Sequence, residues 1–455
     1  MITMKFGGTS VQDADAISNV VTIVRKALPR RPVVIISAIA QATNTLEKIG
    51  KAACEGNGTL AHDEIEALLR RHVSIVNRLI TDQASKKALV EDIAGAGVSL
   101  NRLTSGVEKL RELTPRTMDA FYAFGELLSS KIVAAALADA GIPSAWLDTK
   151  DFMVTDDNFT CARPLMDIMA PRLEAAVSSV LGEGHVPVTQ GFIGVTTAGH
   201  RTTMGRESSD FTGSLIGSVL GAESIEIWTD VAGVLSADPR VVESPSRVGS
   251  MSFSEAYELT YFGAKVLHPG TMLPAEAKDI PIDILKSGDP SMPGTRVSAA
   301  GHAGAAVVRS ITYRQDVAVL TLTPRRREGQ YIFWEHVFGV LTGKRAETLL
   351  MNAMEYQLAL VLRSAEACGE IMDTLKDLCV ADLRTGKSLV CAVGENIVAA
   401  PGIPARFLAA VGQRPVYFYS HGASKNSLVA AIDSPGTEDV VRSLHAEFFG
   451  RAASR

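Results

Sequence analysis

The stretch TTMGRESSDFTGS at 202–214 brings together side chains that can hold an anion. An arginine, a glutamate and an aspartate stand among several hydroxyl groups, directly ahead of the apolar run LIGSVLGA. This order predicts a helix N-terminus, where backbone N–H groups and the helix dipole attract anions. Arg206 adds a planar guanidinium that fits a carboxylate or a phosphate. The other interpretation is an ordinary cap formed by Ser208, Ser209 or Asp210, with Arg206 on the surface.

A second candidate is KFGGTS at 5–10, which follows a short strand signal. Gly7 and Gly8 allow the backbone to approach a ligand, Lys5 can reach the same point, and two hydroxyls can cap the helix that follows. Together these features predict a phosphate cradle without a Walker sequence. The alternative is a glycine turn beside a solvated lysine. The triplet GKS at 386–388 is not expected to form a P-loop, because the residues after it predict a strand.

The elements that must position these residues alternate between strand and helix through the first two thirds of the chain. This alternation predicts a mostly parallel sheet covered on both faces, with ligands at the carboxyl ends of the strands. Gly7-Gly8, Ser37, Gly191 and Thr229-Asp230 fall at such ends. Strands are expected at 1–6, 31–37, 144–148, 185–195 and 224–230, and helices at 16–28, 60–114, 125–141, 164–181 (kinked or broken at Pro171) and 214–222.

The bulk properties fit a globular chain of two or three domains. The chain has 455 residues, of which 46% are hydrophobic, and a net charge of −5 that argues against nucleic-acid or membrane-surface binding. Its five cysteines form no CxxC pair, which favours reduced thiols. We expect no signal peptide, no membrane-spanning run and no protein-ligated metal cluster, and we predict a cytoplasmic location.

A segment rich in Pro, Gly, Ala and Ser at 290–306 predicts a domain boundary. Beyond it, a helix-strand-strand-helix pattern occurs twice, each copy preceded by a strand signal at 317–322 or 388–394. Two such units are expected to pack sheet to sheet and bury each other. Small-molecule sensing is one use of such a pair, and dimerisation is the alternative.

Several blocks of the chain resemble aspartokinases, in the family's order. They are KFGGTSV at 5–11, FGELLSS at 124–130, VTQGFIG at 188–194, TTMGRESSDFTGS at 202–214, WTDVAGVLSADPRVV at 228–242 and FGAKVLHPGTMLPA at 262–275. The resemblance implies an α/β fold: a three-layer αβα amino-acid kinase domain with a mostly parallel sheet, followed by paired βαββαβ ACT domains. The implied boundaries are 1–297 for the kinase domain, 298–306 for a linker, and 307–383 and 384–455 for the two ACT-like domains.

The resemblance also implies a reaction, namely transfer of the γ-phosphoryl of ATP to the side-chain carboxylate of L-aspartate. This step begins lysine, threonine and methionine biosynthesis. Mg²⁺ is implied by ATP rather than by protein ligands, and a homodimer or higher homo-oligomer is expected. By similarity, Lys5, Asp210 and Arg206 are catalytic; Ser37, Thr43, Glu126, Arg206 and Ser209 bind aspartate; and Lys5, Gly7, Gly8, Thr229, Asp230, Leu235, Asp238, Arg240, Lys265 and Val266 bind ATP.

Some positions depart from the family's pattern. Glu207 and Ser208 replace two glycines of GRGGSD, and Leu235 replaces a tyrosine. In the first ACT-like unit, Leu349 stands where lysine-sensitive relatives carry an acid, and Asn352, Ala353 and Met354 replace three hydroxyls. We therefore expect lysine inhibition to be weak or absent, with a different amino-acid effector as the alternative. A kinase for another acceptor, or a non-catalytic sensor, remains the competing function.

Overall fold

The computed structural model describes residues 1–205, 208–264, 267, 269–301, 307–326 and 329–450. The chain divides into two compact units, which are described separately. The first unit comprises Met1–Val234, Gly249–Phe253 and Val266–Gly301, and the second comprises Leu235–Val248, Ser254–Lys265 and His302–Arg455. The predicted domain boundaries remain predictions.

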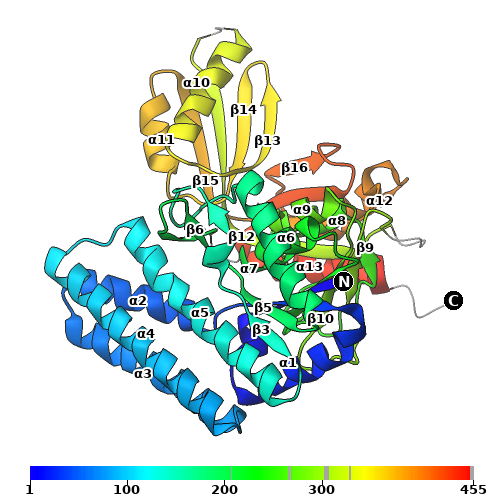
Figure 1. Cartoon of the computed structure of the whole chain (residues 1–455). Coiled ribbons are helices and arrows are strands. Elements are labelled where there is room, and N and C mark those ends of the chain that lie inside the picture. Colours follow the sequence, from blue (N-terminus) through cyan, green and yellow to red (C-terminus); the bar gives the residue numbers. More distant parts are fainter. Residues whose placement is uncertain (206–207, 265–266, 268, 302–306, 327–328, 451–455) are drawn as a thin grey trace. The chain divides into compact units, whose positions relative to one another are not determined.

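An eight-stranded sheet forms the centre of the first unit (Figure 1). Its order is β3-β5-β2-β1-β8-β10-β11-β9, and the pairs from β3 to β10 are all parallel, as predicted. Only β11 pairs antiparallel, with β10. The strands are β1 (Ile2–Phe6), β2 (Pro32–Ile36), β3 (Ser144–Trp146), β5 (Val186–Gln190), β8 (Ile225–Thr229), β9 (Ser250–Met251), β10 (Ile282–Lys286) and β11 (Thr295–Val297).

Helices cover both faces of this sheet, because alternate residues of its buried strands point in opposite directions. Val34 and Ile36 of β2 join one core with α1 and α5, whereas Val33 and Ile35 join another with α6 and α7. This arrangement confirms the three-layer αβα prediction. The helices of the unit are α1 (Ala14–Ala27), α2 (Ala42–Glu55), α3 (Gly58–Leu79), α4 (Gln83–Leu110), α5 (Pro115–Asp139), α6 (Met166–Gly182), α7 (Ser208–Val219) and α9 (Pro269–Glu276).

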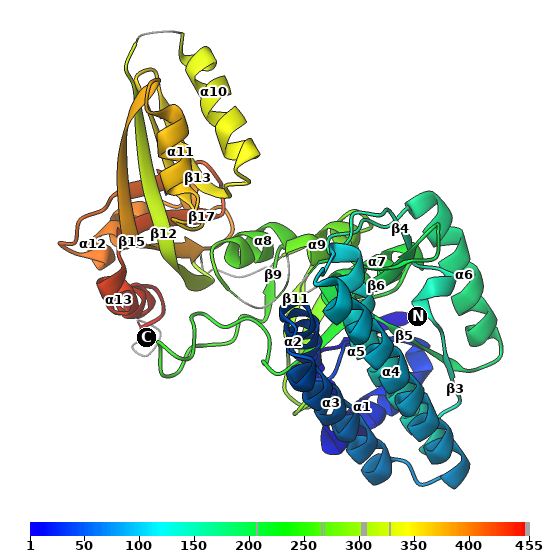
Figure 2. The same cartoon turned by 90° about the vertical axis from the view of Figure 1, so that its left-hand side faces the viewer.

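Helices α2, α3, α4 and α5 lie side by side, as Figure 2 shows. Thr114 caps α5 by accepting a hydrogen bond from the Thr117 N–H, and Pro115 occupies the first helical position, where its missing N–H costs nothing. A kink or a break was predicted at Pro171, and the structure excludes the break, since α6 runs continuously from Met166 to Gly182.

Helix α5 corrects one expectation about hydropathy. Among the described residues it is the one helix long and apolar enough to cross a membrane by length and composition, whereas no such run was expected. Within its apolar window, 72% is buried inside the structure. Burial of this kind is what the core helix of an αβα sandwich requires.

The first unit also contains a small three-stranded sheet, in the order β4-β6-β7. It consists of β4 (Val154–Thr155), β6 (Ile193–Thr196) and β7 (Arg201–Thr203). The single strand expected at 185–195 is therefore two strands, β5 and β6. The chain changes direction at Gly191-Phe192, where Phe192 adopts a φ of 66°.

The second unit contains one continuous six-stranded sheet, in the order β13-β14-β12-β15-β17-β16. The two repeats were expected to stack sheet to sheet, but they instead join edge to edge through the long strands β12 and β15. The repeats comprise β12 (Ser310–Pro324), α10 (Gln330–Gly343), β13 (Thr348–Met354), β14 (Gln357–Leu362), α11 (Cys368–Leu375), β15 (Cys379–Val393), α12 (Ile403–Val411), β16 (Phe418–His421), β17 (Ser427–Asp433) and α13 (Thr437–Phe449), and the unit also holds most of α8 (Phe253–Tyr261).

Each repeat keeps its own core under this shared sheet. One core packs α10 and α11 against β12 and β14, and the other packs α12 and α13 against β15 and β17. The GKS triplet at 386–388 lies inside β15, where Lys387 pairs with Asp433, so it forms no P-loop.

Candidate active site

The carboxyl ends of four neighbouring strands meet at one edge of the main sheet. The Gly7 N–H donates to the Trp228 carbonyl at 3.0 Å, which joins the ends of β1 and β8. The Ser37 N–H donates to Phe6 O at 3.1 Å, and the Gly191 N–H donates to Ile36 O at 3.0 Å. The turns that the sequence placed at strand ends therefore lie side by side, where parallel α/β sheets bind ligands.

The Gly7-Gly8 turn comes very close to the backbone that follows β2. A Cβ atom added at Gly8 would lie 2.8 Å from Ala38 O, so only glycine fits there without a shift. The expectation that the next two hydroxyls cap a helix is wrong. Thr9 is exposed, and Ser10 Oγ donates to the Trp228 carbonyl and lies 2.7 Å from Ser287 Oγ. The long helix α1 is instead capped by Asp13.

Lys5 lies beneath this turn and points toward it. A Cβ atom added at Gly7 would lie 3.6 Å from Lys5 Nζ, and only 8% of the lysine residue is exposed. Its ammonium forms an ion pair with Asp210, in the first turn of α7. A nearly buried lysine held by one carboxylate at the end of β1 can offer its remaining N–H groups to an anion.

Helix α7 begins beside the end of β5. A Cβ atom added at Gly191 would lie 2.8 Å from Ser209 Cβ, so this glycine allows the first turn of α7 to approach the strand end. The Thr212 hydroxyl accepts the Phe192 N–H at 3.0 Å and fixes that contact. Ser37 is buried, and Thr43 is half-buried in the first turn of α2.

Glu126 is the most perturbed acid in this region. Its residue is 3% exposed, and its Oε2 has no hydrogen-bond partner among the described residues. Burial raises the pKa of Glu126 to about 8, although a backbone hydrogen bond from Ala38 and the charge of Lys5 act in the opposite direction. A buried carboxyl with a free oxygen and a raised pKa can accept a cationic group, which would stabilise its ionised form.

Several predicted residues cannot be placed at this edge. Arg206, Lys265 and Val266 lie outside the described residues. By contrast, Thr229 ends β8 at this edge and Asp230 follows it, and the Thr229 hydroxyl donates to Asp230 Oδ1 at 3.0 Å. Leu235, Asp238 and Arg240 belong to the second unit, where Arg240 pairs with Asp238 at 2.6 Å.

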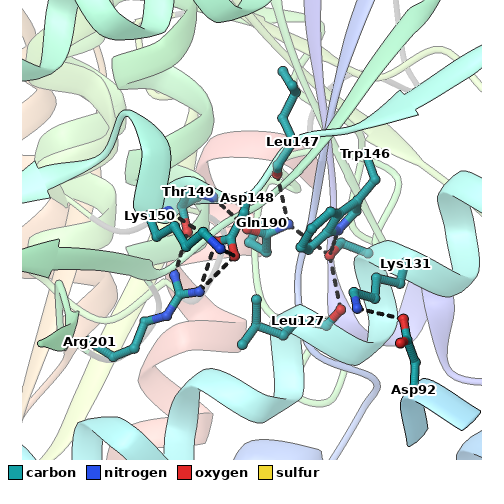
Figure 3. Close-up of polar contacts among 11 residues, drawn as sticks. Asp92, Leu127, Lys131, Trp146, Leu147, Asp148, Thr149, Lys150, Gln190 and Arg201 are labelled. Atoms are coloured by element: carbon teal, nitrogen blue, oxygen red, sulfur yellow. Dashed lines mark hydrogen bonds and ion pairs between the residues drawn. The ribbon is translucent and has the colours of Figure 1, made fainter. Parts of the chain in front are cut away.

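The structure adds residues that the sequence analysis missed. Gln190, fully buried at the end of β5, accepts the Thr149 N–H and donates to Ser130 Oγ and Leu147 O. Figure 3 shows this network together with Arg201, whose Nη2 donates to both oxygens of Asp148 at 2.8 Å. A polar residue in the middle of the strand expected at 185–195 was the available signal, because a buried glutamine must be fully hydrogen-bonded.

Comparison with known proteins agrees with this fold. Residues 1–286 match the model of the amino acid kinase family, and residues 390–448 match an ACT domain model. The chain is 32% identical to aspartokinase 3, chloroplastic, of Arabidopsis thaliana, over 98% of this chain and 81% of that protein. It is 30% identical to the lysine-sensitive aspartokinase 3 of Escherichia coli, over 99% of each protein.

Comparison with solved structures also finds aspartokinases. The crystal structure of E. coli aspartokinase III in complex with aspartate and ADP matches with a TM-score of 0.87 and 30% identity, covering 99% of this chain and 100% of that one. A second structure of that enzyme, with lysine and aspartate, matches with a TM-score of 0.80. The chain therefore belongs to the amino acid kinase family. Within that family it is one of the aspartokinases, with a C-terminal ACT region.

Proposed function

We propose that this protein transfers the γ-phosphoryl group of ATP to the side-chain carboxylate of L-aspartate, at the strand-end edge that holds Lys5. The observation that carries the proposal is the position of Lys5, nearly buried beneath the Gly7-Gly8 turn and paired with Asp210. A phosphoryl transfer needs a fixed cation at the point where negative charge develops.

The acceptor chemistry requires little more than positioning. The side-chain carboxylate of aspartate has an ordinary pKa of about 3.9, so it is already ionised at neutral pH and needs no general base. Lys5 would neutralise the transferring group, and the Gly8 N–H would hold one of its oxygens. The Gly7 N–H, also predicted for this role, instead donates to the Trp228 carbonyl. A site of this kind needs no catalytic histidine.

We assign the acceptor's ends to two groups. The ammonium of aspartate would lie against Glu126, whose free Oε2 and raised pKa suit a cationic partner. The α-carboxylate would pair with Arg206 near the start of α7, with Ser37, Thr43 and Ser209 offering hydroxyls. These roles rest on the family resemblance and on the positions of the described residues.

The nucleotide side is assigned by resemblance alone. Thr229, Asp230, Leu235, Asp238, Arg240, Lys265 and Val266 would contact ATP. No cluster of three or more His, Cys, Asp or Glu ligands occurs in the described part of the chain. By resemblance, Mg²⁺ would be held chiefly by the phosphates, with Asp210 as the nearby carboxylate, and would neutralise phosphate charge when bound.

The ACT region would bind an amino-acid effector and join subunits into a homodimer or a higher oligomer. Its Leu349 is buried, and β13 carries Asn352, Ala353 and Met354 in place of hydroxyls. A site without these polar contacts would hold lysine poorly. The cytoplasm remains the proposed location.

Trapping of the acyl phosphate by hydroxylamine tests the proposed function. With ATP and Mg²⁺, we expect hydroxamate to form with aspartate and not with glutamate. Activity with glutamate alone would assign a different acceptor. ATP binding without activity toward either amino acid would favour the sensor interpretation and would implicate the Glu207-Ser208 change.

A further inference from the structure

Asp119 is a fully buried carboxylate on α5 that no predicted role uses. Its Oδ2 accepts the Thr160 N–H at 2.8 Å and the Thr203 N–H at 3.0 Å, and its Oδ1 accepts the Thr203 hydroxyl at 2.6 Å. Three donors from two separate segments therefore converge on one side chain. Hydrogen bonds to a buried carboxylate are strong, because the charge has no water to compete for it.

The two segments held by Asp119 are those that lead into the candidate site. Thr203 is the last residue of β7, and Met204-Gly205 follows it toward α7. A Cβ atom added at Gly205 would have Thr160 O, 3.8 Å away, as its near neighbour. The Ala162 N–H donates to Thr203 O at 2.9 Å, so the two segments are also joined to each other. Asp119 thus fixes the backbone immediately before the GRESSD segment.

Asp119 and Glu126 stand on the same face of the same helix. They are separated by seven residues, which is close to two helical turns and about 10 Å along the axis. A helix of this length is rigid, and α5 is anchored further along. Ser129 Oγ donates to Ser37 O at 2.8 Å, and Ser130 Oγ accepts from Gln190 at 3.0 Å.

The first residue of β7 is held independently. Arg201 pairs with both oxygens of Asp148, in the loop after β3, and Figure 3 shows this clamp beside Gln190. The short strand β7 is therefore held at one end by Asp148 and at the other by Asp119. Only the Asp119 end adjoins the segment that enters α7.

We propose that Asp119 is a positioning residue for the amino-acid acceptor, which sets the distance between Glu126 and the segment between β7 and α7. This inference rests on the proposed function, since it assumes that the acceptor's ammonium meets Glu126 and that its carboxylate meets the other segment. Asp119 itself touches neither the acceptor nor the nucleotide. It acts by holding Thr203 and Thr160.

Removal of the Asp119 side chain tests this role, because its effect on the KM for aspartate can be compared with its effect on the KM for ATP. In Asp119→Ala, the N–H groups of Thr160 and Thr203 lose their acceptor, and the segment can move. A displacement of about 1 Å costs up to about a hundredfold in this kind of site, so we expect the KM for aspartate to rise about tenfold or more. The KM for ATP is expected to stay within a factor of about two, because no nucleotide contact changes.

A matched control lies on the same helix. Asp139, the last residue of α5, also accepts two backbone N–H groups and one threonine hydroxyl, from Thr81 and Asp82. Asp139→Ala loses an equivalent set of hydrogen bonds away from the strand-end edge, and we expect both Michaelis constants to remain unchanged. Melting temperatures are measured for both variants.

Two milder variants keep the test valid if Asp119→Ala does not fold. In Asp119→Asn, the amide oxygen accepts both N–H groups and the amide nitrogen donates to the Thr203 hydroxyl, so the KM for aspartate should return to within about threefold of the unaltered protein. Thr203→Val removes one of the three hydrogen bonds and should give an intermediate KM.

The inference is overturned if Asp119→Ala, or Thr203→Val in its place, raises the KM for aspartate no more than Asp139→Ala does. It is also overturned if the two Michaelis constants rise together, since that pattern indicates general loss of structure. Failure of the proposed function would look different, because the unaltered protein would then form no hydroxamate with aspartate.

Discussion

Burial raises the pKa of Glu126 far above its usual range, and replacing this residue by glutamine removes the titrating group. The carboxyl group has an ordinary pKa of 4.5, and burial raises the pKa to about 8. Between these values the folded protein binds a proton that the unfolded chain has released. The free energy of unfolding therefore falls as the pH rises through this window, and it levels off above about pH 8.

The size of this effect follows from the shift. The difference between the two pKa values is about 3.5 units, and each unit is worth about 1.4 kcal/mol, so the whole window amounts to about 5 kcal/mol. Between about pH 5 and about pH 9 the expected loss is about 4 kcal/mol. Glutamine has nearly the same shape and does not titrate, so Glu126→Gln should be spared this loss.

Urea unfolding of the ligand-free protein at several pH values measures the difference directly. Relative to the unaltered protein, Glu126→Gln should gain stability steadily as the pH rises toward about 8. Glu91→Gln, the same change at an exposed position on α4, is the control and should show no such gain. Parallel pH profiles for the unaltered protein and Glu126→Gln would refute the reasoning.

Three further predictions concern the active site, and a fourth concerns the ACT region. Lys5→Met should lower kcat with aspartate by a factor of at least about a hundred, with the fold retained, because the cation at the transferring group is lost; a kcat within tenfold of normal in the hydroxamate assay would contradict this role. Gly8→Ala should reduce activity and lower the free energy of unfolding by about 1–3 kcal/mol, because the added Cβ would lie 2.8 Å from Ala38 O. Calorimetry and kcat measurements check this, and an unchanged melting temperature would count against the close approach. Aspartate binding below about pH 8 should release a proton as Glu126 ionises, and aspartate affinity should rise as the pH increases toward that value. Titration calorimetry in buffers of different ionisation enthalpy measures the proton release, and a binding heat that is the same in every buffer would contradict it. Lysine should inhibit weakly or not at all, since Leu349 replaces an acid in β13; half-inhibition at micromolar lysine would disprove this.

The sequence predicted the architecture of the first unit because its strands carry unmistakable signals. The apolar runs of β1, β2, β5 and β8 each end at a glycine or a small polar residue, and parallel sheets bring such ends together. The contact between Lys5 and the Gly7-Gly8 turn, and the parallel pairing, could be predicted from this pattern alone.

Long-range polar contacts could not be predicted in the same way. Asp119 lies in an apolar helix, 84 residues from Thr203, and no local pattern states which backbone groups it will meet. Gln190 stands out as a polar residue in an apolar strand, but the sequence does not state which three groups it will bond. The raised pKa of Glu126 likewise depends on burial, which spacing does not reveal.

The second unit shows another limit of sequence reasoning. The repeated pattern can be recognised in the sequence. Whether the sheets of the two repeats stack face to face or join at an edge depends on the pairing of β12 with β15. The hydrophobic pattern of a strand does not state which other strand it will pair with, so it does not distinguish the two arrangements. Pro171 likewise predicted a kink or a break, yet α6 runs continuously from Met166 to Gly182.

The identity of the phosphorylated group tests the central claim most directly. Borohydride reduces an acyl phosphate to an alcohol, so the product formed from aspartate, ATP and Mg²⁺ can be trapped and identified. The account predicts homoserine, which arises only when the side-chain carboxylate carries the phosphoryl group. Recovery of 3-amino-4-hydroxybutanoate would show transfer to the α-carboxylate and would contradict the assignment of Glu126 and Arg206 to the acceptor's ends.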